Sequence, residues 1–156
     1  MKKLVFSLCV ALSFVLMACD SVNPSEQYLG VYSFNATGDI EFSIAGASYT
    51  MPLNEHGTFT MSAVDDEGRV VLTGYNDSIY GTISGKKLFF ESTTMTKEYN
   101  GMTILLTFVY GTGTFEGNQL TWTTDVQGSA SGTVMNIPVT ATGSGTVLMT
   151  ATKAEQ

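Results

Sequence analysis

The sequence of 156 residues has the length of a single domain with a hydrophobic core, and it carries a net charge of −7. This acidic balance, with no cluster of basic residues, excludes nucleic acid as a partner because phosphate backbones would be repelled. Aromatic and β-branched residues occur along the whole chain, which excludes a disordered protein.

The N-terminal segment has the order of charge and hydropathy that secretion requires. Lys2 and Lys3 precede an apolar run over residues 4–17. This run is too short to cross a hydrocarbon core, which needs about 20 helical residues, so we predict a signal peptide over residues 1–18 that is removed. The run ends in the sequence LMAC at residues 16–19, which resembles the lipobox cut by the lipoprotein signal peptidase, although Met17 is bulkier than usual. The alternative is an ordinary secretory signal in which Cys19 is incidental.

If the lipobox is cut as the resemblance implies, Cys19 becomes the first residue of the mature chain. The resemblance implies a thioether-linked diacylglycerol on Cys19, often with a third acyl chain, and two or more acyl chains hold a protein durably on a membrane. We therefore expect a lipid-anchored protein of the cell envelope, on the periplasmic or surface side of the outer membrane rather than at the inner membrane. Asp20 does not decide which membrane holds the protein. An acidic residue at this position retains lipoproteins at the inner membrane in enteric bacteria, whereas in other groups it directs export to the cell surface.

The mature chain begins with a polar segment over residues 19–27 that contains Pro24, and we predict that this segment is a tether. Five basic and fourteen acidic residues then remain, which gives a net charge of about −9. Because Cys9 leaves with the signal peptide and Cys19 is acylated, we expect neither a disulfide nor a cysteine metal site. Packing and strand pairing alone must stabilise the single domain predicted over residues 28–156.

From Tyr28 onward, apolar and polar residues alternate with the period of a β-strand, and helical periodicity is absent. We predict about ten short strands joined by hairpin-length turns, each strand beside its sequence neighbour. The clearest apolar runs lie at residues 39–44, 49–53, 59–63, 70–75, 79–83, 88–95, 104–110, 114–116, 120–126, 134–141 and 146–152. Because an exposed strand edge invites aggregation, we expect the first strand, near residues 28–36, to pair with the last, near residues 146–152.

Two segments, residues 81–90 and 113–122, share the pattern G-T-apolar-x-G-x-x-L-x-aromatic. Each segment predicts a strand, a turn begun by a glycine with positive φ, and a returning strand. The leucine and the final aromatic residue are two positions apart, so they share one face of the returning strand. This repeat of a hairpin favours an up-and-down barrel over a solenoid.

Together, the lipobox, the sequence LGVY at residues 29–32 and the two hairpins resemble the calycin or lipocalin-like domains of bacterial envelope lipoproteins. Lipocalins open with Gly-x-Trp on their first strand, and Gly30-Val31-Tyr32 occupies that place, whereas the other two lipocalin signature motifs are not evident. The resemblance, over residues 28–152, implies an all-β, antiparallel up-and-down barrel of about eight to ten strands. It also implies a lumen large enough for a ligand and an aromatic residue that plugs one end.

The leading functional hypothesis is non-catalytic binding of a small apolar or amphiphilic ligand in the lumen. The expected wall residues lie on the more apolar faces of their strands and are Tyr32, Phe90, Phe108, Trp122 and Met149, although core packing alone also explains Trp122. The alternative is a barrel filled by its own side chains that docks another envelope protein.

We expect no catalytic residue, no metal site and no cofactor. His56 is the only histidine, and we predict that it lies exposed in a turn. The acidic sequence DDEG at residues 65–68 lacks the alternate spacing of calcium loops and favours a solvated turn. Glu91 and Glu116 are expected to face solvent rather than to form a pair for glycoside hydrolysis.

Overall fold

The computed structural model describes residues 25–44, 46–74, 77–99, 101–134 and 137–155. The predicted signal peptide, Cys19 and most of the predicted tether lie outside these ranges. The described chain forms an all-β, antiparallel up-and-down sheet of ten strands, which confirms the predicted fold class. In this part of the chain, no helix is long and apolar enough to cross a membrane.

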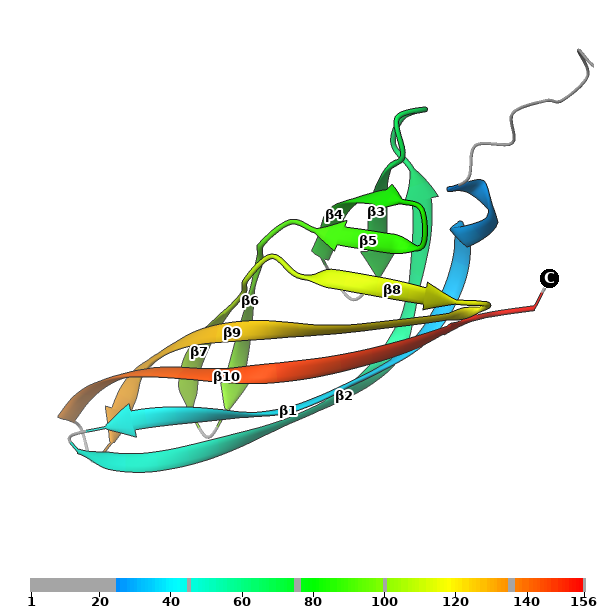
Figure 1. Ribbon diagram of the computed structural model, residues 1–156. Helices are drawn as coiled ribbons and strands as arrows, with labels where there is room; N and C mark the ends of the chain where they lie inside the picture. Colours follow the sequence, from blue (N-terminus) through cyan, green and yellow to red (C-terminus); the bar gives the residue numbers. More distant parts are fainter. Residues whose placement is uncertain (1–24, 45, 75–76, 100, 135–136, 156) are drawn as a thin grey trace, which may run out of the picture.

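Four long strands run the length of the molecule, and six short strands divide between its two ends (Figure 1). The long strands are β1 Gly30–Ile44, β2 Ala47–Ala63, β9 Gln119–Val134 and β10 Ile137–Lys153. Near the C-terminus lie β3 Arg69–Gly74, β4 Asp77–Ser84, β5 Lys87–Phe90 and β8 Thr112–Glu116, whereas β6 Thr93–Tyr99 and β7 Met102–Phe108 lie toward the other end. A 3₁₀ turn, Glu26–Tyr28, precedes β1.

Eight strands close into a ring in the order β1, β2, β3, β4, β5, β8, β9 and β10, because β10 pairs with both β1 and β9. The predicted pairing of the first strand with the last is confirmed, from Tyr32 opposite Lys153 to Ser43 opposite Thr142. The strand order departs from the predicted meander because β5 pairs with β8. The β6–β7 hairpin lies instead beside the second half of β9, so residues 119–123 of β9 pair with β8 and residues 126–132 with β7.

Beyond β3 and β8, the sheet is open and has the order β2, β1, β10, β9, β7, β6; we call this part the trough.

Two hydrophobic clusters fill the interior. The ring core contains Tyr28, Tyr32, Phe59, Met61, Val70, Leu72, Ile83, Leu88, Phe90, Phe115, Leu120, Trp122 and Ala151. The trough core contains Ala36, Ile40, Phe42, Met51, Leu53, Ile104, Leu106, Val126, Ala130, Ala141 and Val147.

Several predicted strand boundaries are wrong. Residues 49–53 and 59–63 belong to one continuous strand, β2, and most of residues 134–152 belong to β10. The glycines within β10 do not form turns but allow β10 to lie close to β1. A Cβ on Gly145 would lie 2.1 Å from the Asp39 carbonyl oxygen. Conversely, the run predicted at residues 88–95 breaks at Glu91 and Ser92, where the chain leaves the ring for the trough.

The two repeated hairpins are confirmed as β4–β5 and β8–β9. Their turns contain Gly85 and Gly117 with φ of 61° and 60°. The two returning strands bury the leucine and the final aromatic residue of each repeat. The equivalent aromatics, Phe90 and Trp122, pack against each other with ring centroids 4.4 Å apart. Gly113 lies beneath them, because a Cβ there would come within 3.1 Å of the Phe90 ring.

Candidate functional site

A cavity of about 140 Å³ lies where the ring core meets the trough core. Phe34 and Met149 line it and pack against both clusters. Its walls are almost entirely apolar, and five aromatic side chains contribute to them: Phe34, Phe59, Phe90, Phe108 and Trp122. The cavity is about the size of an engineered cavity of roughly 150 Å³ that binds benzene, and smaller than the roughly 300 Å³ at which drug-sized sites begin.

The cavity lies where the short strands of the ring end and those of the trough begin, and this boundary explains why the side chains leave a volume unfilled. β3 ends at Gly74, and Gly111 lies between β7 and β8; both glycines line the cavity and contribute no side chain. The surrounding aromatics come from different strands, and four of them pack in two pairs, Phe34 with Phe59 and Phe90 with Trp122. Phe34 and Phe59 lie with ring centroids 6.1 Å apart, which fixes one side of the wall.

Four of the five predicted wall residues line the cavity: Phe90, Phe108, Trp122 and Met149. They reach it from β5, β7, β9 and β10, so the ring and trough topology brings them together. The cores also bury Trp122, which is 6% exposed, so its packing role and its cavity-lining role coexist.

Tyr32, the fifth predicted wall residue, lies away from the cavity lining and helps to fill the N-terminal end of the ring. Its ring stacks on Phe59 at 5.1 Å, and its hydroxyl donates a hydrogen bond of 2.6 Å to the Tyr28 carbonyl oxygen. Beside it, Tyr28 stacks on Phe115 at 3.9 Å. Burial, with a smaller contribution from Tyr28, raises the pKa of the Tyr32 hydroxyl from 10.0 to about 12.

Sequence reasoning missed other wall residues, among them Phe34, Leu53, Glu55 and Met95. Phe34 could have been found, because it is two residues from Tyr32 on the same face of a predicted strand. Glu55 could not, because the sequence predicted a turn near His56, whereas β2 continues through this segment and points Glu55 inward with Leu53.

The trough closes toward β2 through side chains instead of backbone pairing. Among the described strands, β7 is the hydrogen-bonded neighbour of β6, and the facing edge of β2 does not pair with it. Lys97 of β6 forms an ion pair with Glu55 of β2. Further along this seam, the hydroxyl of Tyr49 donates a 3.3 Å hydrogen bond to that of Tyr99. Glu55 therefore belongs both to the cavity wall and to the contact between the two strand edges.

The remaining candidates for chemistry are exposed and lie apart from one another. His56 is exposed as predicted, but it lies within β2 and not in a turn. Glu91 and Glu116 are both exposed, and Glu91 also lies in the lining of the cavity, at its solvent boundary. Among the described residues, no three histidines, cysteines or acids gather into a group that could hold a metal ion.

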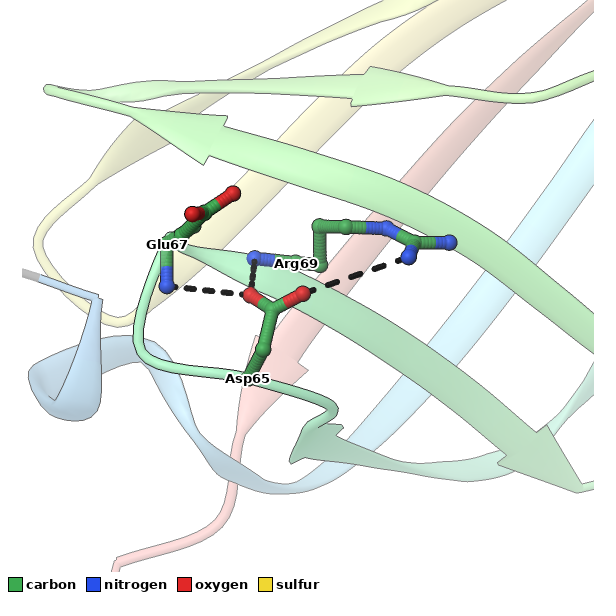
Figure 2. Close-up of polar contacts among 3 residues, drawn as sticks. All are labelled: Asp65, Glu67 and Arg69. Carbon is green, nitrogen blue, oxygen red and sulfur yellow. Dashed lines mark hydrogen bonds and ion pairs between the residues drawn. The ribbon is translucent and has the colours of Figure 1, made fainter.

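The acidic segment at residues 65–68 is a turn ordered by Asp65 (Figure 2). The Asp65 Oδ1 atom accepts hydrogen bonds from the backbone N–H groups of Glu67 at 3.0 Å and Arg69 at 3.1 Å. Its Oδ2 atom lies 3.9 Å from the Arg69 guanidinium. These contacts give this carboxylate a structural role in the turn, as expected for the solvated turn predicted from the sequence.

No family model matches this sequence, and no curated protein matches it. Solved structures with a similar arrangement include the YwiB protein of Bacillus subtilis, with 6% identity, a TM-score of 0.35 and coverage of 83% of this chain and 98% of that one. The attachment invasion locus protein Ail of Yersinia pestis, crystallised with the heparin analogue sucrose octasulfate, has 10% identity, a TM-score of 0.25 and coverage of 80% and 98%. The S-type phycobiliprotein lyase CPES of Guillardia theta has 8% identity, a TM-score of 0.19 and coverage of 88% and 98%. With TM-scores this low, these likenesses assign neither a family nor a function.

Proposed function

We propose that this protein is a calycin-like or lipocalin-like envelope lipoprotein, anchored by acyl chains on Cys19, that binds a small apolar or amphiphilic ligand without catalysis. The observation that supports ligand binding is the apolar cavity between the two cores, lined by Phe90, Phe108, Trp122 and Met149. Because its walls are almost entirely apolar, water in this cavity has few hydrogen-bonding partners, and a ligand that replaces such water gains van der Waals contacts.

The size of the cavity limits the ligand to a small ring or a short alkyl segment. At about 140 Å³ the space accommodates one benzene-sized group, and any larger part of a ligand must extend out of it. The partners under this proposal are the membrane and the small ligand. Aromatic and methionine side chains suit such a site, because they offer large apolar contact areas and methionine adapts its shape.

Binding can be tested with the mature lipidated protein in nanodiscs of zwitterionic lipid. Trp122 is the single tryptophan and lies in the cavity wall, so ethylbenzene should shift or quench its emission with saturable, one-to-one binding. Ala36→Leu places extra methyl groups in the cavity and should weaken this binding. Thr37→Leu, on the exposed face of the same strand, is the matched control and should bind as the wild type does. Unsaturable binding, equal in all three proteins, would reflect the lipid alone and would contradict the proposal.

The alternative function is docking of another envelope protein, and one surface feature favours it. Tyr80 on β4 and Phe89 on β5 are 43% and 45% exposed, and they are diagonal neighbours because Phe89 lies opposite Thr82. Exposed aromatic residues that lie together are frequent in protein contact sites. Mass spectrometry of molecules that co-purify with the native protein separates the two functions, since a small ligand supports the first and a stoichiometric protein supports the second.

A further inference from the structure

The ionisable side chains in the cavity wall are all negatively charged. Glu55 and Glu91 are the two ionisable residues in the lining, and both are acids. Glu55 is only 23% exposed and points inward from β2, two residues after Leu53. A carboxylate at the boundary between an apolar cavity and solvent has fewer water molecules around it, so its interactions with charges are stronger than at an open surface.

The partner of Glu55 is a lysine side chain that comes from another strand. Lys97 follows Met95 on the inward face of β6, and its ammonium group meets the Glu55 carboxylate across the seam. Met95 lines the cavity, whereas Lys97 does not, so the protein's own ammonium group lies just outside the cavity. Glu55 is thus already a partner for one ammonium group, and that group belongs to a residue outside the cavity lining.

The net charge at the cavity favours a ligand of positive charge. With Glu55, Glu91 and Lys97, the local charge is −1. A ligand carboxylate would compete with two acids for one lysine, whereas a ligand ammonium would bring the local charge to zero. The strongly acidic mature chain acts in the same direction over longer distances. The aromatic walls add to the preference, because aromatic faces attract cations.

We propose that the cavity selects small cationic amphiphiles, in which an aromatic ring or short alkyl group carries a protonated amine. The apolar group lies among Phe34, Phe59 and Trp122, and the ammonium lies at Glu55, where it shares or replaces the contact with Lys97. This inference rests on the proposed function and names the chemical class of its ligand.

The test compares three probes of similar size that differ in charge, each titrated against Trp122 emission of the mature lipidated protein in zwitterionic nanodiscs. The probes are 2-phenylethylamine, 2-phenylethanol and 3-phenylpropionate. The amine should bind about tenfold more tightly than the carboxylate, with the alcohol between them. If none of the three binds, both the proposed function and this inference fail. If the alcohol binds as tightly as the amine, or the carboxylate binds best, this inference fails while the proposed function stands.

Two substitutions with opposite expected effects sharpen the test. Glu55→Gln keeps the side-chain shape and should reduce amine affinity to that of the alcohol. Lys97→Gln removes the competing ammonium and should raise amine affinity several-fold; a loss of amine affinity in this variant would overturn the proposal. Glu41→Gln, on the exposed face of β1, makes the same change in net charge as Glu55→Gln and should leave all three affinities unchanged. Circular dichroism of each variant checks that the fold is intact.

Discussion

Tyr32 combines a full burial of its ring with one hydrogen bond from its hydroxyl group, and this combination makes its contribution to stability measurable. Tyr32→Phe removes the hydrogen bond to the Tyr28 carbonyl oxygen and leaves that oxygen without its donor. We expect the free energy of unfolding to fall by about 1 kcal/mol, as is typical for one such bond. Urea denaturation near pH 8 measures the loss, and an unchanged midpoint would contradict the role of this bond.

The same residue predicts how stability depends on alkaline pH. The folded protein raises the Tyr32 pKa from 10.0 to about 12, because the neutral hydroxyl is preferred in the buried site. The stabilisation of the neutral form is therefore fully present below pH 10 and is lost as pH rises from about 10 to about 12. Tyr32→Phe should flatten this part of the profile in denaturation curves. An equally steep decline in wild type and variant would show that other groups cause it.

Gly145 shows that a small residue can set the path of a strand. A Cβ at this position would lie 2.1 Å from the Asp39 carbonyl oxygen and 3.0 Å from the Cα of Ile40, so the backbone of β1 would have to move. We expect Gly145→Ala to lower the free energy of unfolding by about 1–3 kcal/mol, the usual cost of overpacking. Gly111→Ala is the matched control, because its Cβ would make contacts of 3.4 Å or more and should have little effect on the midpoint. Equal midpoints for the two variants would contradict the argument.

At the scale of elements, β10 is the strand on which closure of the ring depends. It pairs with β1 over residues 142–153 and with β9 over residues 137–152. Deletion of residues 144–156 would expose edges of both neighbours and remove Val147 and Ala151 from the cores. We expect the truncated protein not to fold, as measured by loss of cooperative thermal unfolding.

The control for this deletion removes only residues 155–156, which lie beyond β10, and should unfold as the wild type does. A stable monomer without residues 144–156 would disprove the importance of closure.

Period-two alternation and turn glycines are local signals, and they predicted the all-β fold and the repeated hairpins. The same signals divided the long strands β2 and β10, which are continuous. The break after β5 also has a local signal: Leu88 and Phe90 face inward at even positions, whereas Thr93 and Met95 face inward at odd positions. By contrast, the placement of the β6–β7 hairpin depends on which strand offers a free edge of the right length, which is β9. Such pairing is decided by packing between distant segments, and alternation does not encode it.

The candidate site was predictable to the extent that it consists of inward-facing aromatic residues on recognisable strands. Phe90 and Trp122 were found because they lie on the more apolar faces of their strands. The cavity itself was not predictable, since it is the volume left where two separately packed cores meet. Glu55 was missed because the sequence predicted a turn near His56, whereas β2 continues there and places this charged side chain on an inward face, in contact with Lys97.

At the scale of the whole molecule, both described ends of the chain lie at the same end of the fold (Figure 1). The Lys153 ammonium donates a 2.8 Å hydrogen bond to the Gln27 carbonyl oxygen, and the Ala154 N–H donates to that of Val31. Six residue steps separate Cys19 from Ser25, which allows a reach of about 20 Å. An anchor on Cys19 would therefore hold this end of the ring close to the membrane.

Lipidation of Cys19 remains a prediction that one substitution tests. Cys19→Ala removes the thiol that would carry the diacylglycerol, so the variant should accumulate as an unprocessed or misprocessed precursor without acyl chains. Metabolic labelling with palmitate, followed by mass spectrometry of the N-terminal peptide, measures both effects. Incorporation of palmitate into the variant at the wild-type level would show that the anchor is elsewhere.

The pairing of β1 with β10 also determines when folding can finish. Tyr32 pairs with Lys153, so the ring cannot close until Lys153 has been made and is free to pair. Contacts between residues so far apart in sequence form slowly, because a long loop must be ordered before any pairing is gained. If the chain is exported, as residues 1–18 predict, the ring cannot form on the side of synthesis ahead of β10. Closure would then take place only after this strand has crossed the membrane.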